Sequence, residues 1–241
     1  MTSTTQPDRA APVPEDVRES LFIVVPAYNE GPCLANVVGE LRETYPHVVV
    51  VDDGSTDDTF EVARRCATYA LRHVINRGQG AALQTGVEFA LRRGAQFIAT
   101  FDADGQHCVE DIPAVIEPIW RGDCEIVLGS RFLGSAEDIP RTRRLTLKAA
   151  VLFTRVVNRV ELTDAHNGFR AFSRRAAEQI HITLDRMAHA SELIDQIRRC
   201  GLPMHEVPVR VRYTPYSLAK GQSTRGALRI LFQYLLGRVF Q

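Results

Sequence analysis

The residue types best suited to chemistry gather in the stretch FIATFDADGQH, residues 97–107. An apolar run ends at Asp102, and Asp104 and Gln106 follow at alternate positions. Two carboxylates one residue apart can share one hard divalent cation, and an amide oxygen two residues later can complete the oxygen ligands. A cation held by so few protein ligands usually bridges to substrate phosphates. The stretch therefore predicts a metal–diphosphate site.

The apolar residues before Asp102 predict a buried strand that positions this carboxylate. In open α/β sheets, ligands bind at the edge formed by the carboxyl ends of the strands. Most short D-x-D sequences are solvated loops or helix caps. Here the preceding strand, a Gly105 that permits a tight turn, and further motifs upstream favour a site.

Three other motifs adjoin expected strands. PAYNE, residues 26–30, carries a ring, an amide and a carboxylate that can hold a base and a ribose. VDDGSTDDT, residues 51–59, places Asp53 where acids of dinucleotide folds accept hydrogen bonds from base or ribose groups. NRGQG, residues 76–80, contains Gly78 and opens a helix whose N-terminus favours anions. Each motif alone is also compatible with an ordinary turn.

Apolar runs alternate with helical segments between residues 20 and 131. This alternation predicts an α/β fold with a mostly parallel sheet covered by helices on both faces. Strands are expected at 21–26, from 47 onward, at 71–76, in the run before Asp102 and at 125–131. Helices are expected at 32–44, 60–66, after NRGQG as far as Gly94, and at 109–121.

The alternation weakens after residue 131. Helices are expected around 145–160, 191–200 and 225–240, a strand at 204–213, and a flexible segment at 216–224. Residues 1–19 are rich in Pro, Thr, Asp and Glu without an apolar period, which is typical of a mobile leader. We therefore expect one domain at 20–214, followed by a flexible loop and a C-terminal amphipathic helix at 215–241.

The formal net charge is zero, but it is unevenly distributed. Residues 1–130 hold 10 Lys+Arg and 20 Asp+Glu, whereas residues 131–241 hold 19 and 9. A cationic second half favours an anionic partner such as phosphates or a membrane surface. The basic residues are not interleaved with stacking aromatic residues, which argues against nucleic-acid binding. Five cysteines without a C-x-x-C motif indicate a reducing compartment, and no apolar run approaches the ~18 residues of a membrane span.

The order of these motifs resembles a known family. PAYNE, VDDGSTDDT, NRGQG, DADGQH and GSR follow one another as in the family 2 glycosyltransferases of GT-A fold. Within that family the chain is most similar to the dolichyl- or polyprenyl-phosphate mannosyl- and glucosyltransferases. The likeness covers residues 20–214, and five motifs in order make it specific. It implies a Rossmann-like GT-A domain and an inverting, metal-dependent transfer from a nucleotide sugar.

The resemblance also implies roles for individual residues. The nucleotide sugar would be bound by Pro26, Tyr28, Glu30, Asp53, Gly78 and Asp102. Mg²⁺ or Mn²⁺ would be held by Asp102, Asp104 and Gln106. Arg131 and a basic residue late in the chain would contact phosphates. The family often has a G-x-S-K-like loop there, but this chain reads AKGQST, so Arg212 and Lys220 are both candidates.

The acceptor decides whether a base is required. A phosphate monoester has a second pKa near ~6 and is already nucleophilic at neutral pH. A sugar hydroxyl needs a general base, for which Glu192 and Asp164 are the candidates. The leading hypothesis is transfer of a hexose from a GDP-, UDP- or dTDP-sugar to polyprenyl phosphate. The alternative keeps the fold and transfers to a hydroxyl of a glycan or small molecule.

The last helix, 225–240, carries apolar residues at helical spacing with arginines nearby. Such a helix either lies in a membrane interface or packs on the domain or on a second copy, and the sequence leaves these alternatives open. Family members often add transmembrane helices or a membrane-bound partner. We therefore expect a cytoplasmic protein that acts at the inner face of the plasma membrane. Its partners would be peripheral membrane contacts, a small membrane protein or a second copy of the chain.

Overall fold

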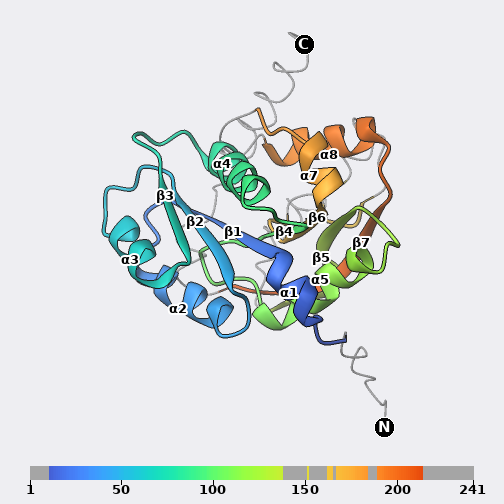
Figure 1. Ribbon diagram of the computed structural model, residues 1–241, viewed down its shortest axis with the longest axis horizontal. Helices are drawn as coiled ribbons and strands as arrows, with labels where there is room; N and C mark the ends of the chain where they lie inside the picture. Colours follow the sequence, from blue (N-terminus) through green and yellow to red (C-terminus); the bar gives the residue numbers. More distant parts are fainter. Residues whose placement is uncertain (1–10, 138–150, 152–161, 165–166, 184–188, 214–241) are drawn as a thin grey trace.

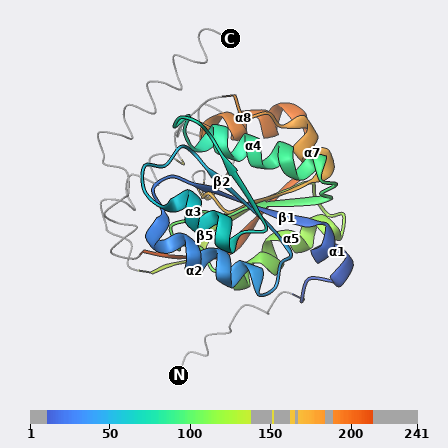
Figure 2. The same ribbon diagram turned by 60° about the vertical axis from the view of Figure 1, so that its left-hand side comes forward.

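The computed structural model describes residues 11–137, 151, 162–164, 167–183 and 189–213. Within these residues, seven strands form one sheet in the order β3-β2-β1-β4-β6-β5-β7. Helices cover both faces of this sheet (Figures 1 and 2). The predicted α/β class with a mostly parallel sheet is therefore confirmed.

The first half alternates strands and helices. Its elements are α1 (Glu15–Ser20), β1 (Leu21–Ala27), α2 (Gly31–Arg42), β2 (His47–Asp52), α3 (Thr59–Cys66), β3 (Tyr69–Arg72), α4 (Gln79–Arg92) and β4 (Phe97–Thr100). All residues of β1 are buried. A strand covered on both faces needs apolar side chains at every position rather than at alternate ones, which explains the unbroken apolar run.

The second half completes the sheet. Its elements are η1 (Val109–Asp111), α5 (Ile112–Trp120), β5 (Ile126–Glu137), β6 (Arg170–Ser173), α7 (Arg174–Gln179), α8 (His189–Cys200) and β7 (Met204–Arg212). Strand β6 lies between β4 and β5 and is antiparallel to both. It brings the segment around Gly168 beside the carboxyl end of β4, where Thr100 Oγ1 donates a hydrogen bond to the Gly168 carbonyl oxygen (2.6 Å).

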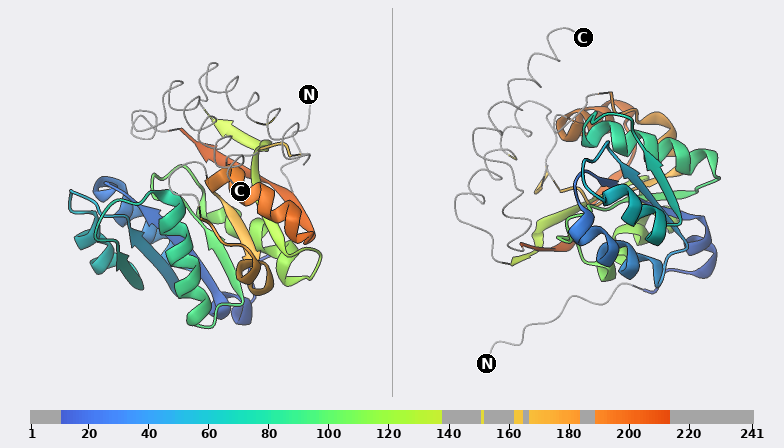
Figure 3. Two further views of the ribbon diagram at one scale, coloured as in Figure 1. Left: turned by 90° about the horizontal axis from the view of Figure 1, so that it is seen from above. Right: turned by 90° about the vertical axis from the view of Figure 1, so that its left-hand side faces the viewer.

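Two apolar cores hold the layers together. One contains side chains of α1, α2 and α5 against one face of the sheet. The other contains side chains of α4, α7 and α8 against the opposite face. The same separation of helices is visible in Figures 2 and 3.

The order of the strands reverses between β1 and β4. The chain adds β2 and β3 on one side of β1 and then returns to place β4 on the other side. In open α/β sheets the crevice at such a reversal is where ligands bind. The loops that follow β1 and β4 are PAYNE and DADGQH, so both motifs lie at this position.

Three sequence-based expectations need correction. The leader expected at 1–19 is wrong for its last part, because Val13 and Val17 are buried and α1 packs on the sheet. The strand expected at 71–76 is Tyr69–Arg72, because Val74 is 99% exposed and Ile75 67%. The short strand β6 was not predicted at all, because its four residues include a buried arginine.

Some expectations lie outside the described residues. They are the leader at 1–10, most of the helix at 145–160, the loop and helix at 215–241, and Lys220. In the described part of the chain, every helix is too short or too polar to cross a bilayer.

Candidate active site

Two carboxylates lie just beyond the carboxyl end of β4. Asp104 accepts a hydrogen bond from the backbone N–H of Gln106 (3.1 Å). Burial, and then the neighbouring charge of Asp102, raise the pKa of Asp104 to about 6. A divalent cation between two such carboxylates would relieve both costs. The pair therefore fits a hard cation by its donor chemistry.

The predicted metal site has only three protein ligands, Asp102, Asp104 and Gln106. No group of three or more His, Cys, Asp or Glu residues suited to a metal occurs among the described residues. A Mg²⁺ or Mn²⁺ site would need only one or two carboxylates, completed by substrate phosphates and water. The side chain of Gln106 is buried, and its backbone carbonyl accepts a hydrogen bond from the N–H of Arg212 (2.9 Å). That Gln106 binds metal stays a prediction.

Asp102 is held from two sides. Gln79 Nε2 at the start of α4 donates to Asp102 Oδ1, and His107 Nε2 lies 3.0 Å from Asp102 Oδ2. The backbone approaches it too, because a Cβ added to Gly168 would lie 2.2 Å from Asp102 Oδ2. Gln79 and Gly168 were not predicted to act here, whereas His107 was expected to be a structural hydrogen-bonding residue rather than a catalyst. Only contacts in space reveal these three neighbours of Asp102.

The loop after β4, which carries Asp102, Asp104 and Gln106, is tied to the far edge of the sheet. His107 forms an antiparallel bridge with Val211, next to the hydrogen bond between Arg212 and Gln106. The side chain of Arg212 is exposed beside this loop. The structure thus brings Arg212 beside the loop after β4, whereas Lys220 lies outside the described residues, and phosphate binding by Arg212 stays a prediction.

The PAYNE loop is fastened to the loop after β2. Asn29, at φ 53°, donates its N–H to Ser55 Oγ and accepts the N–H of Thr56 on its Oδ1 (both 2.9 Å). Pro26 is buried within β1, whereas the ring of Tyr28 is 41% exposed. The Glu30 carboxylate is close enough to Asp104 to contribute to its raised pKa. Tyr28 and Glu30 are therefore presented at the edge where a nucleotide would lie.

Asp53 is buried and faces the NRGQG loop rather than solvent. Its carboxylate accepts the backbone N–H groups of Arg77 (3.0 Å) and Gly78 (2.6 Å). His73 Nδ1 lies 2.7 Å from Asp53 Oδ1, and His73 Nε2 lies 2.9 Å from Thr85 Oγ1. Gly78 has φ 101°, a conformation that glycine adopts without strain. Asp53 thus fixes the turn that opens α4.

Arg131 and Asp164 form a buried ion pair. Arg131 donates its backbone N–H (3.1 Å) and Nε–H (2.5 Å) to Asp164 Oδ2, and its Nη1–H to Tyr213 Oη (2.7 Å). Burial opposes the charge of Arg131, but Asp164 and Tyr213 outweigh burial and raise the pKa of Arg131. Glu206 in turn accepts the N–H of Asp164 (3.1 Å). Arg131, expected to contact phosphates, and Asp164, a candidate base, are therefore direct partners.

Glu192 lies in the first turn of α8 and is buried. Its carboxylate accepts hydrogen bonds from the backbone N–H (3.0 Å) and the hydroxyl of Thr183, and from Gln196 Nε2 (3.3 Å). The structure thus places Glu192 where it anchors Thr183. A catalytic role for Glu192 stays a prediction.

These elements together make a recognisable arrangement. Two carboxylates that could hold a cation follow β4 at the strand reversal, Tyr28 and Glu30 follow β1 at the same edge of the sheet, and the buried Arg131 lies in β5. Such a site suits the departure of a diphosphate, because cation and arginines can stabilise the charge that develops on it.

Comparison with known proteins identifies the family. Residues 22–181 match Glycosyl transferase family 2. An uncharacterized protein of Methanocaldococcus jannaschii is 36% identical over 228 residues, covering 92% of this chain and 94% of that protein. The UDP-N-acetylglucosamine–dolichyl-phosphate N-acetylglucosaminyltransferase of Methanococcus voltae is 31% identical, covering 90% and 95%. The polyprenol monophosphomannose synthase of Mycolicibacterium smegmatis is 29% identical, covering 86% and 83%.

Solved structures share the fold. Glucosyl-3-phosphoglycerate synthase from Mycobacterium tuberculosis, crystallised with Mn²⁺, UDP and phosphoglyceric acid, superimposes with a TM-score of 0.68 at 18% identity. The match covers 91% of this chain and 80% of that one. The GT-A architecture expected from the motifs is thereby confirmed. With the matched family segment and the relatives across nearly the whole chain, the protein belongs to glycosyltransferase family 2 and is a glycosyltransferase.

Proposed function

We propose that the protein transfers a hexose from a nucleotide sugar to polyprenyl phosphate, with inversion at the anomeric carbon, at the cytoplasmic face of the membrane. Two relatives that align with most of this chain are named for transfer to dolichyl phosphate and for synthesis of polyprenol monophosphomannose. The structural observation that carries the proposal is the burial and hydrogen bonding of the two candidate bases, Asp164 and Glu192. Both are buried and engaged in hydrogen bonds within the protein.

A hydroxyl acceptor would need a base within reach of its proton. Asp164 is bonded to the guanidinium of Arg131, and Glu192 is bonded to Thr183. Taking up a proton at either carboxylate would weaken bonds that hold a buried charge or a chain segment. A phosphate monoester needs no such step, because it is largely ionised at neutral pH. The geometry therefore favours a phosphate acceptor.

Binding of the nucleotide-sugar donor would depend on the carboxylates of Asp102 and Asp104. Asp102 and Asp104 would hold the divalent cation, which when bound supplies Lewis-acid stabilisation of the departing diphosphate. His107 and Gln79 keep Asp102 in place for this task. Tyr28 and Glu30 would contact base and ribose, and Asp53 would act by shaping the loop around Gly78.

A lipid-extraction assay tests the proposal. The full chain would be incubated with Mn²⁺, polyprenyl phosphate and, in turn, radiolabelled GDP-, UDP- and dTDP-hexoses. We expect label to enter the organic phase with one donor, and NMR of the product to show the anomeric configuration opposite to that of the donor. Label that stays in the aqueous phase with every donor would refute a lipid acceptor, and retained configuration would refute inversion.

A Glu192→Gln variant separates this proposal from transfer to a hydroxyl. Glutamine keeps an oxygen that can accept from Thr183 but cannot act as a base. We expect the turnover number with polyprenyl phosphate to fall less than about threefold, because no base is needed. A fall of 10²-fold or more with unchanged donor affinity is the size expected for a lost general base and would favour the hydroxyl acceptor. Glu117→Gln, on the outer side of α5, serves as the control.

A further inference from the structure

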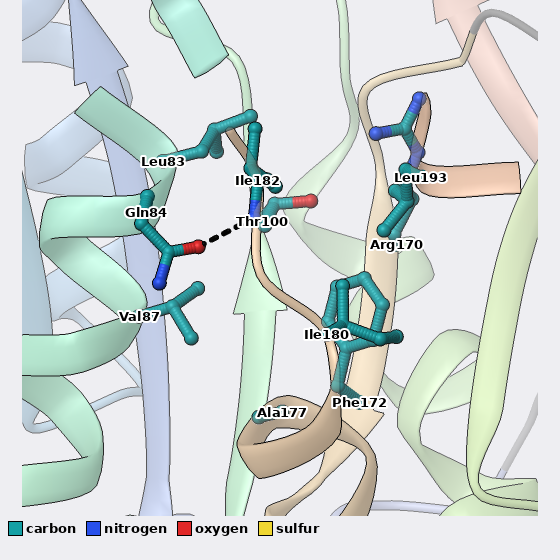
Figure 4. Close-up of a pocket in the computed structure, with 10 residues that line it drawn as sticks. All are labelled: Leu83, Gln84, Val87, Thr100, Arg170, Phe172, Ala177, Ile180, Ile182 and Leu193. Carbon is teal, nitrogen blue, oxygen red and sulfur yellow. Dashed lines mark hydrogen bonds between the residues drawn. The ribbon is translucent and has the colours of Figure 1, made fainter. Parts of the chain in front are cut away.

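Arg170 is a buried cation that none of the motifs above assigns to the site. It begins β6 and pairs with Thr100 of β4, two residues before Asp102. Its side chain is 5% exposed. Figure 4 shows its guanidinium at one end of a small pocket, with Phe172 and Ala177 at the other end. The charged group therefore lies on the side of the pocket nearer the carboxyl edge of the sheet.

The guanidinium has charged neighbours but no direct partner. Within the described part of the chain it makes no hydrogen bond and no ion pair, and Asp102 and Asp164 act on it only through their charge. Burial lowers the pKa of Arg170 to about 10, and these two carboxylates offset only part of that effect. Arg170 is thus still a cation at neutral pH. Arg131 offers the contrast, because its equally buried guanidinium is bonded to Asp164 and Tyr213.

A buried charge without a partner is costly to the fold, and an apolar residue of similar size is usually at least as stable in such a place. The walls of the pocket would suit one, since they include Leu83, Val87, Phe172, Ile180 and Leu193. Within the described residues only the charges of Asp102 and Asp164 oppose this cation, and neither bonds to it, so the guanidinium is available to a further anion. Arg170 is close enough to Asp102, a predicted metal ligand, and to Asp164, the partner of Arg131, for both charges to act on it, so the anion would lie near these residues.

We propose that Arg170 binds a phosphoryl oxygen of a substrate during turnover. The planar guanidinium presents paired donors that match a phosphate, and such charge-assisted bonds are among the strongest in proteins. The pocket, about 20 Å³, has room for roughly one water molecule, so a phosphate would have to reach the guanidinium from outside this pocket. The inference rests on the proposed function in one respect, namely that the donor and the acceptor both carry phosphate. The phosphoryl oxygen bound by Arg170 could belong to the donor diphosphate or to the acceptor phosphate.

The test compares wild type with Arg170→Met, Arg170→Lys and the control Arg92→Met, whose side chain is 79% exposed on α4. Isothermal titration with UDP and with GDP in saturating Mn²⁺ gives the affinity for a donor diphosphate. Steady-state kinetics give the KM for polyprenyl phosphate, and thermal melts give the Tm of the ligand-free protein.

We expect Arg170→Met to keep or raise the Tm of the ligand-free protein. If the donor is the source, its nucleoside diphosphate affinity falls at least tenfold. If the acceptor is the source, that affinity is unchanged and the KM for polyprenyl phosphate rises at least tenfold. Arg170→Lys keeps the charge but loses the paired donors, so it should lose at least threefold in the same constant. Arg92→Met should match wild type throughout.

A folded Arg170→Met protein with both constants within twofold of wild type overturns the inference. So does a large fall in Tm with unchanged constants, since Arg170 would then only balance the charges of Asp102 and Asp164. If Arg170→Met does not fold, Arg170→Lys tests the inference through the same two constants, the nucleoside diphosphate affinity and the KM for polyprenyl phosphate. A wild-type enzyme that makes no lipid-linked product refutes the proposed acceptor, while the nucleoside diphosphate titration still decides the role of Arg170.

Discussion

His107 Nε2 lies 3.0 Å from Asp102 Oδ2, and the imidazole ring packs against Phe101 and Phe169 with ring centroids 5.4 and 5.3 Å away. Because a carboxylate only accepts hydrogen bonds, this contact places the hydrogen on Nε2. His107 Nδ1 is buried and has no partner among the described residues. The ring thus acts as an oriented donor that fixes one oxygen of the predicted metal ligand.

A His107→Phe variant should keep the aromatic packing and lose this hydrogen bond. Partners that orient a metal ligand typically contribute 10- to 100-fold to metal affinity or activity. We expect the Mn²⁺ concentration for half-maximal activity to rise by about that factor, while the Tm of the metal-free protein changes little. Titration of activity with Mn²⁺ measures the effect. His205→Phe, at an exposed position at the start of β7, is the control, and an unchanged Mn²⁺ requirement in His107→Phe would remove His107 from this role.

Metal binding should depend on pH through Asp104. Burial and Asp102 raise its pKa to about 6, and a cation requires the ionised form. The Tm increase produced by Mn²⁺ should therefore shrink as pH falls through about 6. In Asp104→Asn the increase should be nearly absent at every pH, and in the exposed control Asp123→Asn it should match wild type. A Mn²⁺ effect independent of pH between 5 and 7.5 would contradict this prediction.

The same shift predicts the behaviour of the metal-free protein. The folded-state pKa of Asp104 lies above the unfolded value of 3.8, so the folded state binds more protons between about pH 4 and 6. The contribution of Asp104 to stability is therefore present at low pH and is lost as pH rises through about 6. Above that pH, Asp104→Asn should raise the free energy of unfolding of the metal-free protein by about 1–2 kcal/mol. Urea unfolding with a chelator present measures this free energy. A variant less stable than wild type would show that the ionised Asp104 carboxylate does not destabilise the metal-free fold.

How far the sequence predicts this site depends on the distance between partners along the chain. The apolar run that forms the strand is adjacent to Asp102 in the sequence. The position of this carboxylate at a sheet edge could therefore be predicted from the sequence alone. The partner of Arg131 is Asp164, and the loop containing Gln106 is joined to Arg212. Nothing local in the chain encodes those pairs, because they form only when β5, β6 and β7 assemble.

The direction of a side chain is also hard to predict from the sequence. Asp53 follows a strand as a nucleotide-binding acid would, yet its oxygens face the backbone of Arg77 and Gly78. Arg170 sits in a short strand that is antiparallel to its neighbours, whereas apolar periodicity predicted parallel strands. The hydrogen bonds of Asp53 and the antiparallel pairing of β6 both depend on which distant chain segment packs next to the residue in the folded protein.

Asp53→Asn tests whether this carboxylate acts through the loop. The amide would offer an N–H group where the backbone N–H of Arg77 or Gly78 needs an acceptor, leaving a buried donor unsatisfied. We expect the free energy of unfolding to fall by about 1–3 kcal/mol. Affinity for UDP or GDP should fall with it, because the turn that opens α4 is no longer fixed. A variant that loses nucleotide affinity at full stability would show instead that Asp53 contacts the nucleotide directly.

Gly168→Ala tests the closeness of β6 to the metal ligand. The added Cβ would lie 2.2 Å from Asp102 Oδ2 and 2.6 Å from Oδ1, so the carboxylate must move. Misplacing a catalytic group by about 1 Å can cost 10²-fold in rate. We therefore expect at least that loss in kcat/KM. The matched control is Gly39→Ala in α2, where the new Cβ has no neighbour within 4 Å and alanine favours the helix by about 0.5–1 kcal/mol. Activity near wild type in a folded Gly168→Ala protein would mean that Asp102 can move without consequence, and the carboxylate pair could not then be the cation site.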